Sequence, residues 1–575
     1  MTGSLILCIC LAYFVAAYFF YGGFLKRVFS IDPKRPTPAH TNYDGVDYVP
    51  TPKMVLFGHH FASIAGPGPI VGPIMAAYFG WLPALIWILI GCVFVGAFHD
   101  FAALVISARN RGRSISFVME KLMGFSGRQL FLLFCFCCLL LVVAIFTNMI
   151  AGMFVKIPEV ATASLIFICL APLFFIVTYR FKVRLTYASV VFVPLVYLTV
   201  FIGANYPFDL ITLFGLSDGT ARIVWMLILA LYIFLASVIP VQWLLQPRDY
   251  LNSWLLYGML LLAFAAIFAY APSINMNSFN GWSAVTADGN LTSMFPALFI
   301  FIACGACSGF HALVASGTTV KQIDSEKDML PVGYGAMLLE GVLGVVALIA
   351  VMSMSNSDFA EFGKNPTVAF ATGISNFSSA LGISVAYAKI FISLAIAAFM
   401  MTSLDTATRL GRFLCQEIFM PRSVRDNSES SEDSVAEGNE PVGFRRILTD
   451  KYFASFIIVS ISMLMGFSGS AAVLWPIFGA SNQLMAAITF LIITLWLLMK
   501  DSKWYLSFIP MIFMTVMSLW GVVQVVVQHW GSNHVLAATG IVLIIMAIMM
   551  IMLGISIMYH KFKGTAAKTV ELTVR

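Results

Sequence analysis

Long apolar stretches alternate with short polar segments along almost the entire chain. A helix needs roughly 20 apolar residues to cross the hydrocarbon core of a bilayer, and about fifteen stretches approach or exceed that length. They lie near residues 4–24, 54–78, 81–108, 128–153, 161–178, 186–205, 222–247, 252–272, 293–319, 330–354, 385–408, 452–469, 473–499, 504–527 and 535–559. The pattern predicts an all-α polytopic membrane protein with about 15 transmembrane helices.

The composition agrees with this class of protein. Of the 575 residues, 60% are hydrophobic and 10% are charged, whereas soluble domains carry about 25% charged residues. The first stretch is too long for the apolar core of a signal peptide and has no basic segment before it, so we expect a retained helix. The ten cysteines lie almost wholly in apolar stretches, which favours packing over disulfides or metal binding.

Basic residues are unevenly divided between the two sides of the predicted bundle. If the N-terminus is outside and the helices alternate in direction, one side receives all 33 Lys and Arg residues except Lys156, Arg222, Lys364 and Lys389. The positive-inside rule makes the richer side cytoplasmic. This predicts an external N-terminus and a cytoplasmic C-terminus. It also accounts for the net charge of +6 without a nucleic-acid partner.

The stretch from Gly58 to Gly80 is unusual for a membrane helix. It contains the adjacent histidines His59 and His60, followed by Gly66-Pro67-Gly68-Pro69. Proline removes a backbone donor and glycine loosens a helix. Free backbone groups persist at membrane depth only when they are buried in protein or line a wet cavity. We expect an interrupted helix of the kind that binds substrate and ion in secondary transporters; the alternative is a kinked helix without a ligand.

Five predicted helices run from residue 54 to 205, and five more run from 222 to 418. Because five is odd, the two sets have opposite topology, and the second also opens with helix breakers, Pro240 and Pro247. This predicts two inverted five-helix repeats. The other regions are an N-terminal helix and cytoplasmic loop (1–53), a flexible acidic linker (419–450), and four additional helices with a tail (451–575).

Several ionisable residues interrupt the apolar stretches, and each is a candidate functional residue. They are His59, His60, Asp100, His311 and Asp405. At 1.5 Å per residue, all lie roughly 5–13 Å below the cytoplasmic ends of their helices, which predicts one buried polar cluster. The alternative is that they reach water or are satisfied by neighbouring groups. Glu340, nearer the middle of its helix, either pairs structurally or carries protons.

The stretch at 293–319 is rich in small and hydroxylated residues. Small residues let helices approach closely, and the oxygens of Ser308, Ser316, Thr318 and Thr319 are suited to ligate a cation or a substrate. The alternative is that these hydroxyls bond the backbone of their own helices.

Six segments carry a further signal: HHFASIAGPGPIVGPI, GAFHDF, VQWLLQPRDYL, GFHALVASGTT, LDTATRL and LWPIFGASNQL. Together they resemble the carbon starvation protein A (CstA) family, from residue 58 to about residue 485. The resemblance implies membership of the amino acid–polyamine–cation superfamily and a LeuT-like core of two inverted five-helix repeats. It also implies peptide uptake under carbon starvation, and some close relatives resemble proton-coupled pyruvate transporters.

The resemblance also implies where substrate and ion bind. The first and sixth helices of a LeuT-like core are interrupted; here they would be 54–78 and 222–247. The start of the half-helix near Gly68 would suit a carboxylate. The implied substrate contacts are Ser63, Gly66, Gly68, Val241, Gln242, Trp243 and Ser308, and the implied coupling residues are His59, His60, Asp100, His311, Ser316, Thr318, Thr319 and Asp405. Ser63, Ser316 and Thr319 would suit sodium, whereas the histidines with Asp100 would suit protons.

We therefore expect a symporter rather than an enzyme. It would import small carboxylate nutrients (short peptides, amino acids or pyruvate) across the plasma membrane of a prokaryote during carbon starvation. The expected partners are membrane lipid and the substrate, with no cofactor beyond a coupling proton or sodium ion; a homo-oligomer stays open.

Two other classes of function remain as alternatives. The first is an intramembrane metal site of His59, His60, His99, Asp100 and His311, serving metal transport or metalloenzyme chemistry. Histidine and carboxylate suit such metals, but neither HExxH nor HxxEH spacing occurs in the sequence. The second is a channel or sensor, which would not accumulate substrate against its gradient.

Overall fold

The computed structural model describes residues 2–44, 48–240, 243–286, 289–419, 444–469 and 471–563. Most of these residues are helical, and the sheet found among them is one antiparallel hairpin, β1 (Ser283–Val285) with β2 (Leu291–Ser293). Most of the predicted linker at 419–450 lies outside the described residues, which resume with α21 (Phe444–Thr449). The predicted all-α polytopic class is confirmed.

Twelve helical segments of the described chain are long and apolar enough to cross a membrane, and each overlaps a stretch predicted from the sequence. They are α1 (Gly3–Val28), α5 to α6 (Trp81–Arg109), α7 (Ile115–Lys156), α8 with η3 (Pro158–Arg180), α9 (Leu185–Asn205), α11 (Asp218–Val238), α12 (Leu245–Tyr270), η5 to α16 (Glu326–Met352), α19 (Val385–Phe419), α23 (Ala471–Met499), α24 (Tyr505–His529) and α25 (His534–Phe562).

The other three predicted stretches are interrupted or short. Residues 54–78 form α3 (Lys53–Ile64) and α4 (Gly68–Ala76), and residues 293–319 form α13 (Met294–Phe301), α14 (Ala303–Ala306) and α15 (Gly309–Gly317). The third, α22 (Lys451–Phe467), has 17 residues. The count of about 15 crossings depends on these segments and stays a prediction. Smaller elements are α2 (Pro38–Thr41), η1 (Ala77–Phe79), α10 (Leu210–Phe214), η4 (Thr319–Gln322), α17 (Asn356–Phe362), α18 (Pro366–Ser378) and η7 (Ser379–Leu381).

The predicted interruption within 222–247 is wrong. Helix α11 runs unbroken to Val238, and Ile239 has an extended backbone (φ −69°, ψ 144°) because it precedes Pro240. Pro240 therefore ends α11, whereas Pro247 lies in the first turn of α12. The second interrupted segment is 293–319, where α13, α14 and α15 follow one another with short breaks.

Backbone contacts sort the connecting segments onto two faces. On one face, the amide of Gly3 donates to Pro272 O (2.8 Å) and the amide of Asn275 donates to Met352 O (2.9 Å). On the other, the amide of Thr51 donates to Gln322 O (3.0 Å). Both groupings match the alternation of helix direction predicted from the sequence. Which face is cytoplasmic stays a prediction from the basic residues.

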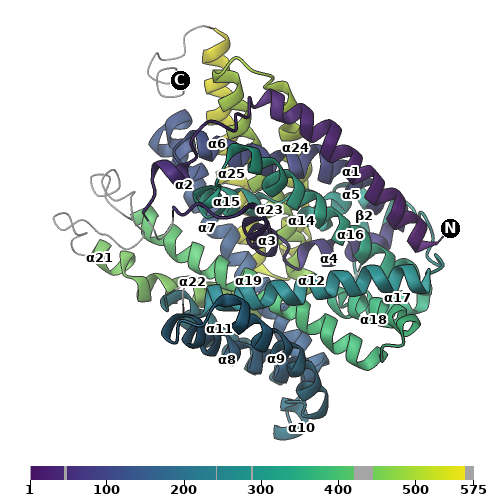
Figure 1. Cartoon of the computed structure of the whole chain (residues 1–575). Coiled ribbons are helices and arrows are strands. Elements are labelled where there is room, and N and C mark those ends of the chain that lie inside the picture. Colours follow the sequence, from purple (N-terminus) through teal and green to yellow (C-terminus); the bar gives the residue numbers. More distant parts are fainter. Residues whose placement is uncertain are drawn as a thin grey trace.

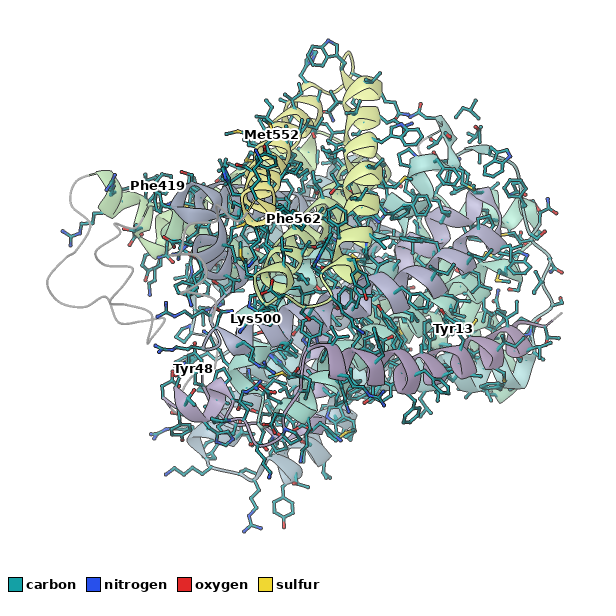
Figure 2. All side chains as sticks on the ribbon, turned by 90° about the horizontal axis from the view of Figure 1, so that it is seen from above. Tyr13, Tyr48, Phe419, Lys500, Met552 and Phe562 are labelled. Carbon is teal, nitrogen blue, oxygen red and sulfur yellow. The ribbon has the colours of Figure 1, made fainter. Side chains whose placement is uncertain are left out.

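The helices are arranged around a buried centre. Figure 1 shows α8, α9 and α11 grouped on one side of the molecule, with α1 and α24 on the opposite side. In the most apolar 18 residues of α23 every residue is buried inside the protein, whereas in those of α1 only 28% of the residues are buried. Figure 2 shows α1, marked by Tyr13, along an outer edge. A membrane would cover such apolar outer faces, which include Phe20 (81% exposed).

Helix α7 is the longest element, with 42 residues. Gly124 interrupts its helical backbone (φ 75°, ψ 179°), a conformation that glycine adopts at low cost because it has no Cβ. Helix α7 packs against α11, α19, α22 and α23, so it contacts helices of the second five-helix group and of the C-terminal region.

Candidate functional site

The two interrupted segments pack closely against each other near the centre of the bundle. A Cβ atom on Gly72 of α4 would collide with the carbonyl oxygen of Phe301, and one on Gly68 would collide with the side chain of Cys304. A Cβ atom on Gly305 of α14 would meet Pro69 Cα at 3.5 Å, an ordinary contact distance. The glycines therefore allow α4 to lie directly against the second interrupted segment, a packing mode typical of membrane helices.

The break between α3 and α4 spans Ala65 to Pro67, all buried. Gly66 and Pro67 are non-helical as expected, whereas Gly68 and Pro69 already belong to α4. Neither Pro67 nor Pro69 has an N–H, so the start of α4 offers fewer free donors than an ordinary helix start. A carboxylate bound here would need more hydrogen bonds from side chains, and fewer from the backbone, than the resemblance to a LeuT-like core implies.

Four buried ionisable residues meet beside this crossing, and we call them the histidine cluster: His99, Asp100, His311 and Glu340. Asp100 lies between two imidazoles, with Oδ1 at 2.8 Å from His99 Nδ1 and Oδ2 at 2.8 Å from His311 Nδ1. The other ring nitrogen of His311, Nε2, lies 3.4 Å from Glu340 Oε2. The structure thus brings Asp100 and His311 together, as their common depth predicted, and adds Glu340.

The members of the histidine cluster come from three helices. Asp100 and His99 lie in α6 (Ala97–Arg109), His311 in α15, and Glu340 in α16 (Ala336–Met352). All four are at most 1% exposed. Neither carboxylate oxygen of Glu340 has a hydrogen-bond partner among the described residues. A buried carboxylate without donors is costly when ionised, so Glu340 is suited to bind a proton or a cation.

Two π-helical turns lie in the helices that carry this cluster. They are η2 (Cys92–Gly96), directly before α6, and η6 (Leu330–Gly335), directly before α16. The Cys92 thiol donates a hydrogen bond to Met337 O (3.2 Å), so the two helices are also linked at this level. Single π turns occur frequently at functional sites because they shift the register of the side chains that follow.

The hydrogen bonds of His59 and His60 are made with residues outside the histidine cluster. Nδ1 of His60 lies 2.8 Å from Thr319 Oγ1, which links α3 to η4 (Thr319–Gln322). Nε2 of His60 has no hydrogen-bond partner among the described residues. His59 is half-buried, and its carbonyl accepts a hydrogen bond from Ser63 Oγ (2.8 Å).

The remaining hydroxyl candidates bond mainly to backbone, as the alternative interpretation anticipated. Ser316 Oγ donates to Ala312 O (2.6 Å) and accepts from the amide of Ile115 (3.2 Å), and Thr318 Oγ1 donates to Val314 O (3.0 Å). Ser316 Oγ therefore has one lone pair in use, whereas Thr318 Oγ1, which only donates, keeps its lone pairs for a cation.

Ser308 differs from these hydroxyls because its partner is a side chain. Its Oγ accepts a hydrogen bond from Asn482 Nδ2 (3.0 Å) in α23, and Asn482 Oδ1 accepts the amide of Phe310 (3.0 Å). Asn482 thus connects α23 to the break between α14 and α15. Ser308, one of the predicted substrate contacts, lies at that break.

Asp405 belongs to a second buried group rather than to the histidine cluster. We call it the arginine cluster: Tyr232, Arg248, Asn252, Thr402 and Asp405. Arg248 pairs with Asp405 and also bonds Tyr232 and Thr402, while Asn252 Nδ2 donates to Thr402 Oγ1 (3.0 Å). Both charged residues are at most 1% exposed. The sequence reasoning missed Arg248, which it assigned to a cytoplasmic loop; the signal was an arginine that falls inside α12.

The substrate contacts expected from 222–247 are not found at the helix crossing. Val241 and Gln242 lie outside the described residues. Trp243 is 57% exposed and stacks on Phe175 of α8, with ring centroids 5.5 Å apart. This follows from the end of α11 at Val238, which places the connection at an edge of the bundle.

In the part of the chain that the structure describes, no group of three or more His, Cys, Asp or Glu residues is arranged to hold a metal ion.

Comparison with known proteins decides the family. The model of the carbon starvation protein CstA family matches residues 2–369 and 362–521. The chain belongs to this family.

Curated relatives of this CstA-family chain match most of its length. A peptide transporter CstA of Campylobacter jejuni is 32% identical over 581 residues, which cover 91% of this chain and 80% of that protein. A peptide transporter CstA of Bacillus subtilis is 32% identical, covering 87% of this chain and 86% of that protein. A pyruvate/proton symporter, BtsT of Escherichia coli, is 29% identical, covering 88% and 79%. The chain is therefore similar to transporters over nearly all of its apolar helices.

Proposed function

We propose that this protein is a secondary active transporter that couples the import of small carboxylate nutrients to protons. The substrate class is short peptides, amino acids or pyruvate, in keeping with relatives named peptide transporter and pyruvate/proton symporter. The observation that carries the proposal is the Asp100–His311–Glu340 chain, buried beside the crossing of two interrupted helices. Interrupted helices near the midplane are the usual binding elements of secondary transporters.

The charges of the histidine cluster favour protons as the coupling ion. An imidazolium at His311 between two ionised carboxylates leaves a net charge of −1 on residues that are at most 1% exposed. Such a charge is costly at membrane depth. A second proton, on Glu340 or Asp100, makes the group neutral. The cluster can therefore exist with one proton or two, which a proton-coupled cycle requires.

The hydroxyls expected for sodium are less suited to that ion here. Ser316 Oγ already accepts the amide of Ile115, and Thr319 Oγ1 is bonded to His60, so sodium would have to compete for these two oxygens. A proton needs only the imidazole and the carboxylates. A carboxylate substrate would contact the break at Ala65–Pro67, where Gly66 faces Ser403 Oγ.

A reconstituted transport assay tests this proposal. Purified protein in proteoliposomes is offered labelled pyruvate or labelled dipeptide, with an imposed proton or sodium gradient. We expect accumulation of one of these substrates when the proton gradient is present and none from the sodium gradient alone. Accumulation that follows only sodium would move the coupling to the hydroxyls. Uptake that never exceeds equilibration would favour a channel, and no transport of any kind would contradict the proposed function.

His311→Ala distinguishes coupling from substrate binding. We expect it to lower gradient-driven accumulation at least about tenfold while leaving exchange of substrate across the membrane largely intact, because accumulation requires the cluster to load and release protons in every cycle. Normal accumulation between about pH 5 and pH 8 would reduce His311 to a packed, hydrogen-bonded residue.

We also propose the orientation inferred from the basic residues, with the N-terminus outside and the C-terminus in the cytoplasm of a prokaryotic cell. Lys34 and Lys364 are exposed on opposite predicted faces. In intact cells, a membrane-impermeant maleimide should label Lys364→Cys and spare Lys34→Cys, after correction for native cysteines. The reverse labelling would invert the topology.

A further inference from the structure

A cavity of about 420 Å³ opens on the face predicted to be cytoplasmic, away from the helix crossing. Its lining includes Arg35 from the segment after α1, Arg109 and Arg111 from the end of α6, and Glu326 from the start of η5. The volume lies within the range of roughly 300 to 1,000 Å³ that is typical of small-molecule sites. The cavity is thus large enough for a ligand, and among its charged lining residues arginine predominates.

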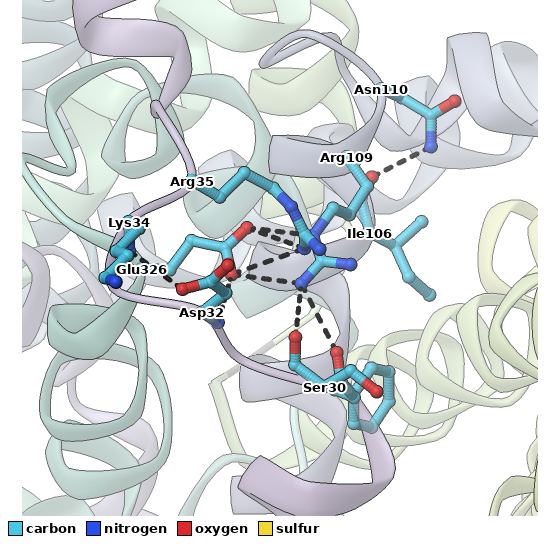
Figure 3. A network of polar contacts seen from close by, with 9 residues as sticks. Ser30, Asp32, Lys34, Arg35, Ile106, Arg109, Asn110 and Glu326 are labelled. Atoms are coloured by element: carbon cyan, nitrogen blue, oxygen red, sulfur yellow. Dashed lines mark hydrogen bonds and ion pairs between the residues drawn. The ribbon is translucent and has the colours of Figure 1, made fainter.

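Glu326 binds two of the three arginines that line this cavity. Arg109 Nε lies 2.9 Å from Glu326 Oε1, Arg109 Nη2 lies 3.0 Å from Oε2, and Arg35 Nη1 lies 3.2 Å from Oε1. The amide of Asp32 also donates to Oε2 (2.9 Å). Figure 3 shows Arg35 and Arg109 converging on Glu326 from two sides. One buried carboxylate therefore orders two guanidinium groups from separate segments.

The third arginine has no such partner. In the described residues, the Arg111 side chain forms no ion pair or hydrogen bond, although its carbonyl accepts Asn42 Nδ2 (2.9 Å). Its backbone is left-handed (φ 61°), an unfavourable conformation for a residue with a Cβ, and Gly112 follows in the same region (φ 72°). The amide of Gly112 donates to Ser107 O (2.9 Å) and closes this turn. The Arg111 guanidinium lines the cavity and has no acidic partner among the described residues.

The charges on this wall do not cancel. Three guanidinium groups face one carboxylate, which leaves a formal charge of +2 on the lining. Arg35 is only partly engaged, because its side chain stays 40% exposed. A guanidinium that has spare donors binds phosphate in a bidentate manner, with both geometry and charge favourable.

We propose that this cavity binds the phosphate group of a small anion, held by Arg111 and by the free donors of Arg35. The phosphate would belong either to a soluble compound, such as inorganic phosphate, or to the headgroup of an anionic phospholipid at the membrane surface. Because its arginines come from the segment after α1 and from the turn after α6, the bound anion ties these segments together around Glu326. The site is separate from the proposed transport site and does not depend on it.

The test uses the intact protein and two sources of phosphate. In detergent, the midpoint of thermal unfolding is measured against sodium phosphate, with sodium chloride at matched ionic strength as control. In nanodiscs of phosphatidylcholine without added phosphate, it is measured against increasing phosphatidylglycerol. We expect a saturable rise of the midpoint in at least one arm. The half-saturating concentration should be about tenfold higher in Arg111→Gln, because a charged hydrogen-bonding group is lost.

Matched variants make the result specific. Arg180→Gln removes an exposed arginine at the end of η3 and should leave the response unchanged. Glu326→Gln should lower the half-saturating concentration, because it frees Arg35 and Arg109. A response to phosphate assigns a soluble ligand, and one confined to phosphatidylglycerol assigns a lipid. No saturable response in either arm, or the same response in Arg111→Gln as in the parent protein, would overturn the proposal.

Discussion

The histidine cluster and the arginine cluster are both buried polar groups at membrane depth, yet they differ in chemistry. Arg248 keeps its positive charge at any physiological pH and is paired with Asp405. His311, Asp100 and Glu340 can each gain or lose a proton, and Glu340 has no hydrogen-bond partner among the described residues. The first cluster is suited to hold α11, α12 and α19 together, and the second to change its charge.

This difference shows that depth and burial do not identify a coupling residue. Asp405 and Asp100 have similar depth and similar burial, and the sequence gives both the same expected role. Only the partner separates them: a guanidinium fixes the ionised carboxylate, whereas an imidazole shares a proton with it. The comparison predicts that substitutions in the arginine cluster affect folding and that substitutions in the histidine cluster affect coupling.

The largest effect is expected from Asp405→Ala. Removing Asp405 takes the closest carboxylate from buried Arg248 and leaves it only Asp249, at 3.5 Å, as an acidic partner; breaking a buried ion pair costs up to about 3–5 kcal/mol. We expect little monodisperse protein in size-exclusion chromatography and a strongly lowered thermal midpoint. The double variant Arg248→Met with Asp405→Leu should recover part of the loss, because it removes the buried guanidinium together with its closest carboxylate, while Asp249 loses this partner. If Asp405→Ala is as stable as the parent protein, the arginine cluster does not stabilise the fold.

A smaller effect on folding but a large one on transport is expected from Asp100→Asn. The amide has nearly the same shape, so the yield of folded protein should stay close to normal. Accumulation driven by a proton gradient should fall at least about tenfold, or roughly 1.4 kcal/mol of coupling. Purified protein in proteoliposomes gives both measurements. If Asp100→Asn fails to fold while Asp405→Ala folds, the two clusters have the opposite roles.

Glu340→Gln should sharpen the role of the second carboxylate. Glutamine resembles protonated glutamate, so the variant should fold and bind substrate. We expect its accumulation to vary less than that of the parent between about pH 5 and pH 8, because the cluster can no longer take up a second proton. The measurement is initial uptake at fixed gradient across that range. An unchanged pH profile would show that Glu340 pairs structurally.

The smallest effect is expected from Trp243→Ala. This side chain lies on the connection just before Arg248, is more than half exposed, and stacks on Phe175. An aromatic pair contributes about 0.5–1.5 kcal/mol, so a small loss of stability should be the main result. Uptake of labelled substrate should stay within about twofold of normal. A severe loss of substrate affinity would restore Trp243 to the substrate site and weaken the assignment to the helix crossing.

The sequence predicted much of this fold because apolar length and breakers are local signals. It located every long helix of the described chain and the break near Gly66. It placed the second break at Pro240, since proline is the visible breaker, whereas the structure has it between Phe301 and Gly309, among small residues that also occur in continuous helices. It predicted that Asp100 and His311 share a depth, but depth carries no information about position around the bundle. Asp405 was therefore grouped with the wrong neighbours.

The interruption of α7 at Gly124 has a consequence for the lipid that surrounds the protein. The part of α7 after Gly124 is about 48 Å long at 1.5 Å per residue, whereas the hydrocarbon core of a bilayer is about 30 Å thick. A rod of that length must lean or protrude, and the thickness of the bilayer decides how far it leans. Since α7 packs against α11, α19, α22 and α23, a change of its tilt is passed to these four helices. The acyl-chain length of the surrounding lipids therefore influences the tilt of α7 and the packing of the helices around it.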